Sequence, residues 1–138
     1  MTAVVLGLGS NVGSRSRNLS AARRRLREKG VRILRQSQVI ETEPWGVTDQ
    51  ARFLNQVVEG EWNGSPRQLL EAAKAVEREG GRVETKRWGP RVVDVDILFF
   101  DDLQVDEPDL VIPHPRIKQR PFVLQSLDEL RISPDGRS

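Results

Sequence analysis

The sequence predicts an α+β fold of the ferredoxin-like type, in which an antiparallel sheet carries helices packed on one face. Three observations lead to this prediction. The expected elements follow the order strand, helix, strand, strand, helix, strand, with a small addition at the end. The second and third strands follow each other without a helix between them. A doubly wound parallel sheet would need more helices than this chain offers.

The first strand and the first helix are predicted within the first 30 residues. The apolar residues 3–8 indicate a buried strand, and a loop containing glycine and serine follows at 9–16. Helical spacing of the apolar residues predicts a helix over 17–29, and Gly30 supplies its stop.

The next two strands are predicted on either side of a long loop. Residues 31–40 alternate weakly and predict the second strand. Residues 41–51 show no periodicity and contain proline and glycine, so they predict the loop. Residues 53–62 predict the third strand, with Phe53 and Asn55 on the same face.

A second helix is predicted to begin at Pro66. Ser65 is a suitable N-cap, proline occupies the first helical position, and Gln68 completes a capping box. We expect this helix to extend to Glu79 and to end at the glycine pair that follows it.

The last third of the chain predicts a basic loop, a strand, a turn and a helix. Residues 82–90 form the loop and residues 92–100 the strongest strand of the chain. A hairpin turn at 101–102 leads into a short strand at 103–105. Three prolines make the next segment irregular, and 121–130 predicts a short final helix.

Length and composition indicate a single globular domain over residues 1–138 and exclude several function classes. The 22 basic and 20 acidic residues give a net charge of +2, which permits phosphate binding without requiring nucleic acid. The chain has no cysteine, which excludes disulfides, thiolate catalysis and thiolate-bound zinc, and its one histidine, His114, excludes a His-rich metal site. The apolar runs are too short for a membrane span or a signal peptide, so we expect a cytoplasmic protein.

Two carboxylates interrupt the apolar strand 92–100. Asp94 and Asp96 should point to the same face, ~6.6 Å apart along the strand. The opposite face would be filled by the alternating apolar residues Val93, Val95, Ile97 and Phe99. Because paired carboxylates repel each other, a cation should compensate them. Mg²⁺ suits two such oxygen ligands, whereas a solvated sheet face or pairing with arginine is the alternative.

Basic residues in the loops beside this strand strengthen the first interpretation. They are Arg82, Lys86, Arg87, Arg91, Lys118 and Arg120. Together with Mg²⁺ they would neutralise a polyphosphate, although each of them taken singly is also a typical surface residue.

Four further residues have both a functional and a structural interpretation. Trp88 and Trp45 stand beside glycine and proline, where they either stack on a heteroaromatic ring or pack their own loops. Asn55 either recognises the hydrogen-bonding edge of a ligand or is a satisfied core amide. His114 contacts a phosphate, acts as a base, or is structural.

Several ordered motifs resemble the 6-hydroxymethyl-7,8-dihydropterin pyrophosphokinase family. The match is strongest in Arg87-Trp88-Gly89-Pro90-Arg91-Val92-Val93-Asp94-Val95-Asp96-Ile97-Leu98. The supporting motifs are Gly9-Ser10-Asn11, Glu41-Thr42-Glu43-Pro44-Trp45-Gly46, Phe53-Leu54-Asn55, Gly81-Arg82-Val83, Pro113-His114-Pro115-Arg116 and Arg120-Pro121-Phe122-Val123-Leu124. The resemblance covers nearly the whole chain and implies one pyrophosphokinase domain with a ferredoxin-like fold.

The resemblance implies an enzyme of folate synthesis that transfers pyrophosphate from ATP to the hydroxymethyl oxygen of the pterin and releases AMP. It implies two Mg²⁺ ions held by Asp94 and Asp96, and catalytic roles for Arg82 and Arg91. The implied pterin-binding residues are Thr42, Pro44, Trp45, Phe53, Asn55, Trp88 and Phe122. The implied ATP-binding residues are Glu77, Arg82, Arg87, Trp88, Arg91, Ile97, His114, Lys118 and Arg120.

We expect a monomer whose partners are small molecules, with neither nucleic acid nor membrane as a partner. Loops at 10–16, 44–51 and 82–90 are expected to close on the substrates. Glu84 departs from the family, which often has a basic residue there, so the rate of closure of the last loop is in question. An RNA-binding domain would instead need exposed aromatic residues on the central strands, and residues 4–8 offer none.

Overall fold

The computed structural model describes residues 1–42, 52–81 and 92–135. Its elements are β1 (Thr2–Ser10), α1 (Arg15–Glu28), β2 (Arg32–Gln36), β3 (Ile40–Thr42), β4 (Phe53–Trp62), α2 (Pro66–Gly81), β5 (Asp94–Phe100), β6 (Val105–Glu107), β7 (Leu110–Ile112), the 3₁₀ turn η2 (Ile117–Gln119) and α3 (Pro121–Glu129).

The main sheet has the strand order β2-β4-β1-β5, and all of its described pairs are antiparallel. β1 pairs with β4 over its whole length, from Thr2 opposite Trp62 to Ser10 opposite Leu54. β2 and β3 share the outer edge of β4, since β3 pairs with residues 53–55 and β2 with residues 58–61. This arrangement confirms the predicted α+β, ferredoxin-like fold.

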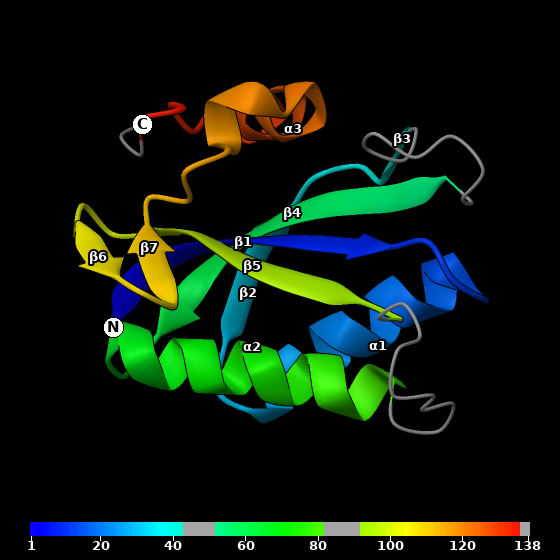
Figure 1. Ribbon diagram of the computed structural model, residues 1–138, viewed down its shortest axis with the longest axis horizontal. Helices are drawn as coiled ribbons and strands as arrows, with labels where there is room; N and C mark the ends of the chain where they lie inside the picture. The colour runs from blue at the N-terminus through cyan, green and yellow to red at the C-terminus, as the bar shows by residue number, and fades with distance from the viewer. Residues whose placement is uncertain (43–51, 82–91, 136–138) are drawn as a thin grey trace.

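Helices cover both faces of the sheet, as Figure 1 shows. α1 and α2 bury Leu26 and Val76 against Leu6 of β1 on one face. α3 buries Leu127 against Val57 on the other face. The expectation that the helices lie on one face only is therefore wrong for α3. The reason is that β1, β4 and β5 also present apolar side chains to the second face, and these need a cover.

Two predicted segments differ from the structure. The strand predicted over 31–40 ends at Gln36, and a separate strand, β3, begins at Ile40 and extends to Thr42 in the segment predicted as a loop. The pairing with β4 is interrupted at the buried Ser37, where the side-chain Oγ accepts the hydrogen bond of Val57 N at 2.9 Å. Residues 103–112 form a hairpin of β6 and β7 in place of a strand at 103–105 followed by an irregular segment. This hairpin is fixed to α2 by Arg67, which pairs with Glu107 and with Asp109, the latter at 2.7 Å.

A β-bulge changes the faces of β5. Leu6 pairs with Ile97 whereas Val5 pairs with Phe99, so Leu98 is an extra residue. Leu98 and Phe99 consequently pack on the same side, toward α3, while Ile97 packs toward α1 and α2. The expected placement of Phe99 beside Val93, Val95 and Ile97 is wrong for this reason.

Within the described residues, the helices are too short or too polar to cross a membrane.

Candidate active site

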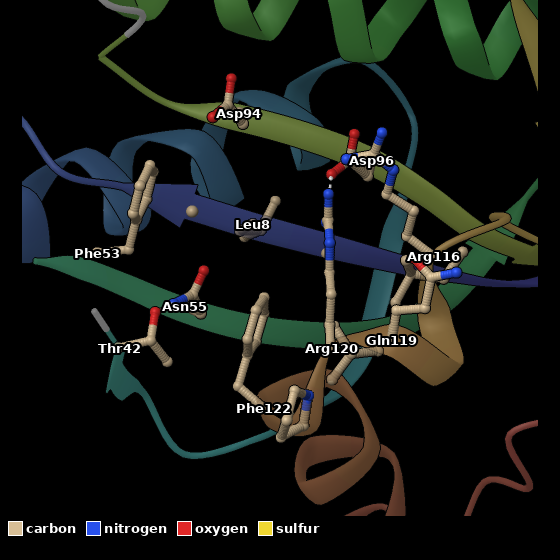
Figure 2. Close-up of a pocket in the computed structure, with 15 residues that line it drawn as sticks. Leu8, Thr42, Phe53, Asn55, Asp94, Asp96, Arg116, Gln119, Arg120 and Phe122 are labelled. Carbon is tan, nitrogen blue, oxygen red and sulfur yellow. Dashed lines mark hydrogen bonds and ion pairs between the residues drawn. The ribbon is translucent and has the colours of Figure 1, made fainter. Parts of the chain in front are cut away.

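A cavity of about 370 Å³ opens on the α3 side of the sheet. β1 contributes its floor, and β3, β4, β5 and the η2–α3 segment contribute its walls (Figure 2). Gly7 pairs with Asp96 across the β1–β5 ladder, and Gly9 pairs with Asp94. Because glycine has no side chain, the floor beside each aspartate stays open.

Asn55 and Thr42 form a polar corner of this cavity. Asn55 is 6% exposed, and its Nδ2 donates a hydrogen bond to Thr42 Oγ1 at 2.7 Å. This bond fixes the amide so that its oxygen points away from Thr42 (Figure 2) and can accept from a bound ring. A Cβ on Gly9 would lie 3.1 Å from Asn55 Oδ1, so glycine at this position leaves room for the amide oxygen.

Two phenylalanine rings flank the polar corner. Phe53 lies at the start of β4 and Phe122 in the first turn of α3, and both line the cavity (Figure 2). A flat heteroaromatic ring fits such a site, because aromatic faces supply stacking while Asn55 reads the polar edge. The structure thus brings four of the predicted pterin-binding residues together: Thr42, Phe53, Asn55 and Phe122.

Asp94 and Asp96 line the same cavity from β5, as their spacing predicts. The Asp96 side chain is 39% exposed, and Arg120 Nη1 lies 3.6 Å from its Oδ2. His114 Nε2 lies 4.0 Å from Asp96 Oδ1. Arg120 therefore supplies part of the positive charge that the carboxylates require.

The aspartate pair has a donor set that suits Mg²⁺. Both side chains supply oxygen, and in the part of the chain that the structure describes they belong to no group of three or more His, Asp or Glu residues placed to hold a metal ion. An open pair of carboxylates leaves coordination positions for water and substrate phosphates, which is the arrangement that Mg²⁺ prefers.

A second cavity, of about 280 Å³, lies on the other side of Asp96. α2, β5, the β6–β7 hairpin and residues 114–115 enclose it, and three predicted ATP-binding residues line it: Glu77, Ile97 and His114. Asp96 lines both cavities, so the two spaces meet at the proposed metal ligand.

Glu77 and His114 are held by the backbone of β5. Glu77 Oε2 accepts a hydrogen bond from Val95 N at 2.9 Å, and His114 N donates to Leu98 O at 3.0 Å. Burial lowers the pKa of His114, Asp96 opposes this effect, and Arg120 and Arg116 add to it. The lowered pKa favours the neutral imidazole at pH 7, which can accept or donate a hydrogen bond without carrying charge.

Some predicted site residues are not brought to either cavity. Lys118 lines neither one, and its Nζ pairs with Asp135 Oδ1 at 2.8 Å. The predicted residues Pro44, Trp45, Arg82, Arg87, Trp88 and Arg91 lie outside the described residues, as do the loops 44–51 and 82–90. The loop predicted at 10–16 is shorter than expected, because Ser10 belongs to β1 and Arg15 begins α1.

Sequence reasoning missed several residues that line the cavities. Arg116 and Gln119 line the first cavity beside Arg120. Leu70 and Lys74 line the second cavity together with Glu77. These three α2 residues are four and then three positions apart, which places them on one helical face. This spacing is the sequence signal that could have identified Leu70 and Lys74 as neighbours of Glu77.

Comparison with known proteins identifies the family. The model of the 7,8-dihydro-6-hydroxymethylpterin-pyrophosphokinase (HPPK) family matches residues 5–132. The chain is 43% identical over 136 residues to the 2-amino-4-hydroxy-6-hydroxymethyldihydropteridine pyrophosphokinase of Methylorubrum extorquens, covering 98% of this chain and 85% of that protein. It is 41% identical over 126 residues to the pyrophosphokinase of the same name from Bacillus subtilis, covering 91% and 75%.

Longer relatives contain the same unit. The chain is 46% identical over 128 residues to the folate synthesis bifunctional protein of Arabidopsis thaliana, which covers 92% of this chain but only 26% of that protein. The solved HPPK-DHPS of Plasmodium falciparum with pteroate has the same fold, with a TM-score of 0.70 at 17% identity, covering 92% of this chain and 38% of that one. Because the family model matches nearly the whole length of this chain, the chain belongs to the 7,8-dihydro-6-hydroxymethylpterin-pyrophosphokinase family.

Proposed function

We propose that this chain transfers the pyrophosphoryl group of ATP to the hydroxymethyl oxygen of 6-hydroxymethyl-7,8-dihydropterin in folate biosynthesis. Family membership supports this activity, and one observation of the site carries it: Asp96 lines two separate cavities. One cavity has aromatic walls and an amide edge that suit a pterin. The other contains residues that the family resemblance assigns to ATP.

The proposed reaction is an in-line displacement at the β-phosphorus. The hydroxymethyl oxygen loses its proton to water and forms a bond to the β-phosphorus. The bond from that phosphorus to the oxygen bridging the α- and β-phosphates breaks, and AMP leaves with this oxygen. Positioning and charge neutralisation supply most of the rate enhancement in such transfers, so the site needs no nucleophilic side chain.

Asp94 and Asp96 would hold two Mg²⁺ ions, which when bound neutralise phosphate charge and lower the pKa of the attacking hydroxyl. Phe53 and Phe122 stack on the pterin, while Asn55 orients it. Arg120, which already lies beside Asp96, neutralises phosphate charge at the point where the cavities meet. By family position, Arg82 and Arg91 stabilise the charge that develops during transfer.

A product assay tests the proposal. The chain is incubated with ATP, Mg²⁺ and the hydroxymethyl dihydropterin, and the nucleotides are separated by chromatography. We expect AMP and the pterin diphosphate in equal amounts. The α,β-methylene analogue of ATP should bind without reacting, because a carbon replaces the bridging oxygen at the bond that breaks. ADP as the nucleotide product would refute the proposal and indicate an ordinary kinase.

We also propose that the enzyme acts as a monomer in the cytoplasm. Among the described residues, this chain alone supplies the aromatic, amide and carboxylate groups of the proposed site, which supports a monomer. Light scattering measures the mass in solution, and we expect the mass of one chain. A specific activity that rises with protein concentration as dimers form would contradict the monomer.

A further inference from the structure

Ser10 connects the end of β1 to the residues that precede Asp94. The described β1–β5 ladder ends where Gly9 pairs with Asp94. Ser10 follows directly, is 1% exposed, and its Oγ donates a hydrogen bond to Val92 O at 2.6 Å. A side chain therefore continues the attachment of β5 to β1 beyond the last backbone pair.

The direction of the Ser10 hydroxyl is fixed by α1. Asn18 Nδ2 donates hydrogen bonds to Ser10 Oγ at 3.1 Å and to Val12 O at 2.7 Å. A serine hydroxyl has one proton and accepts with its lone pairs, so accepting from Asn18 leaves that proton for Val92 O. One small network thus joins β1, α1 and the chain entering β5.

The position of Asp94 at the start of an edge strand makes its placement depend on such an attachment. It is the first residue of β5, and β5 is an edge strand that pairs with β1 alone in the described sheet. Strand ends open locally more readily than strand centres. On the outer edge, Glu77 accepts the hydrogen bond of Val95 N, which holds the strand one residue after Asp94. On the inner edge, the Ser10 bond holds the chain two residues before it.

We propose that Ser10, oriented by Asn18, is a positioning residue that sets the carboxylate of Asp94 relative to that of Asp96. Ser10 is buried and lines neither cavity, so its hydroxyl would touch neither substrate. It acts through the backbone of Val92. Where turnover is the readout, this inference rests on the proposed function.

The test compares Ser10→Ala with a matched control. Ser37 is also a buried serine, 3% exposed, with Oγ accepting from Val57 N at 2.9 Å and donating to Gln38 O at 3.0 Å. It lies between β2 and β3, beyond the opposite edge of the sheet from β5. Each alanine removes the side-chain partner of a backbone group, Val92 O or Val57 N, so Ser37→Ala controls for a general loss of stability.

Two readouts are measured for both variants. The first is hydrogen exchange in the metal-free protein, followed on the peptide spanning residues 92–99. The second is the Mg²⁺ concentration that gives half-maximal turnover. We expect Ser10→Ala to accelerate exchange in this peptide and to raise the half-maximal Mg²⁺ concentration about 10-fold, the lower end of the effect of residues that support metal ligands. Ser37→Ala should change neither readout.

Asn18→Ala provides a milder variant that keeps the test decisive if Ser10→Ala does not fold. It should move both readouts in the same direction by a smaller factor. The proposal is overturned if the Ser10 and Asn18 variants leave either readout at the wild-type value, or if Ser37→Ala moves both equally. A wild-type chain without turnover would refute the proposed function, whereas the exchange comparison would still decide whether Ser10 holds the start of β5.

Discussion

Replacing Gly9 by alanine should weaken pterin binding through Asn55. The new Cβ would lie 3.1 Å from Asn55 Oδ1, a few tenths of an ångström too close. Asn55 is buried and its Nδ2 is bonded to Thr42 Oγ1, so the amide has to turn or shift to relieve the contact. Either movement disrupts the Thr42 bond or the bond that the amide oxygen offers to the pterin.

The magnitude follows from the loss of about one hydrogen bond. A typical bond contributes about 0.5–1.5 kcal/mol, which corresponds to a two- to tenfold increase in the pterin Kd. Alanine is better than glycine in a strand by about 0.5–1 kcal/mol, which offsets the crowding, so Tm should change little. Calorimetric titration with the hydroxymethyl pterin measures the Kd, and ATP affinity serves as the internal reference.

A double-mutant cycle shows whether the effect passes through Asn55. Asn55→Ala should itself weaken pterin binding, but it removes the atom that the new Cβ would crowd. Gly9→Ala introduced into the Asn55→Ala protein should therefore leave the pterin Kd unchanged. The same penalty in both backgrounds would refute the reasoning and place the effect of Gly9→Ala in the backbone of β1.

Three other substitutions test the rest of the site. Asp96→Asn should abolish Mg²⁺-dependent turnover while the fold survives, because the partly exposed ion pair of Asp96 with Arg120 contributes at most about 1 kcal/mol to stability. Wild-type turnover in this variant would show that Asp96 is not a metal ligand. Arg91→Ala should lower kcat on the order of 10²–10⁴-fold with a smaller effect on ATP affinity, and the reverse pattern in steady-state kinetics would indicate a binding role. Arg67→Ala should raise the KM for ATP several-fold without changing the KM for the pterin, because it frees the β6–β7 hairpin, which forms a wall of the second cavity. An equal KM for ATP in the variant and the wild type would show that the hairpin keeps its position without Arg67.

The sequence predicts the elements best where a pattern has clear boundaries. β4 has the predicted bounds because residues 53–62 are enclosed by turn-forming segments. The second helix was expected to end before the glycine pair, yet α2 includes Gly80 and Gly81. A Cβ on Gly80 would lie 3.0 Å from Val93 Cγ1, so glycine here permits close packing against the chain entering β5 rather than ending the helix.

Other features depend on tertiary contacts that no local pattern contains. β6 and β7 have three residues each, too few to show an alternation, and their hairpin is held to α2 by ion pairs between distant residues. The family resemblance predicts Lys118 as an ATP-binding residue, whereas its side chain pairs with Asp135 in the folded chain. The motif that contains Arg116 assigns it no role, and its place in the first cavity depends on the fold.

The bulge in β5 explains both the error about Phe99 and the location of the site. From Ile97 to Phe100 every residue is apolar, so the sequence carries no information about which face each one takes once a residue is added to the strand. The residues of β5 before Leu98 that face α3 are the carboxylates Asp94 and Asp96. After them, the residues that face α3 are apolar, namely Leu98 and Phe99. The apolar part supports the α3 core, which includes Val123 and has Phe122 packed against it, and the same segment brings Arg120 toward Asp96. The change of face at the bulge therefore places the apolar core under α3 directly beside the charged end of β5. The first cavity lies at the boundary between this core and the two carboxylates.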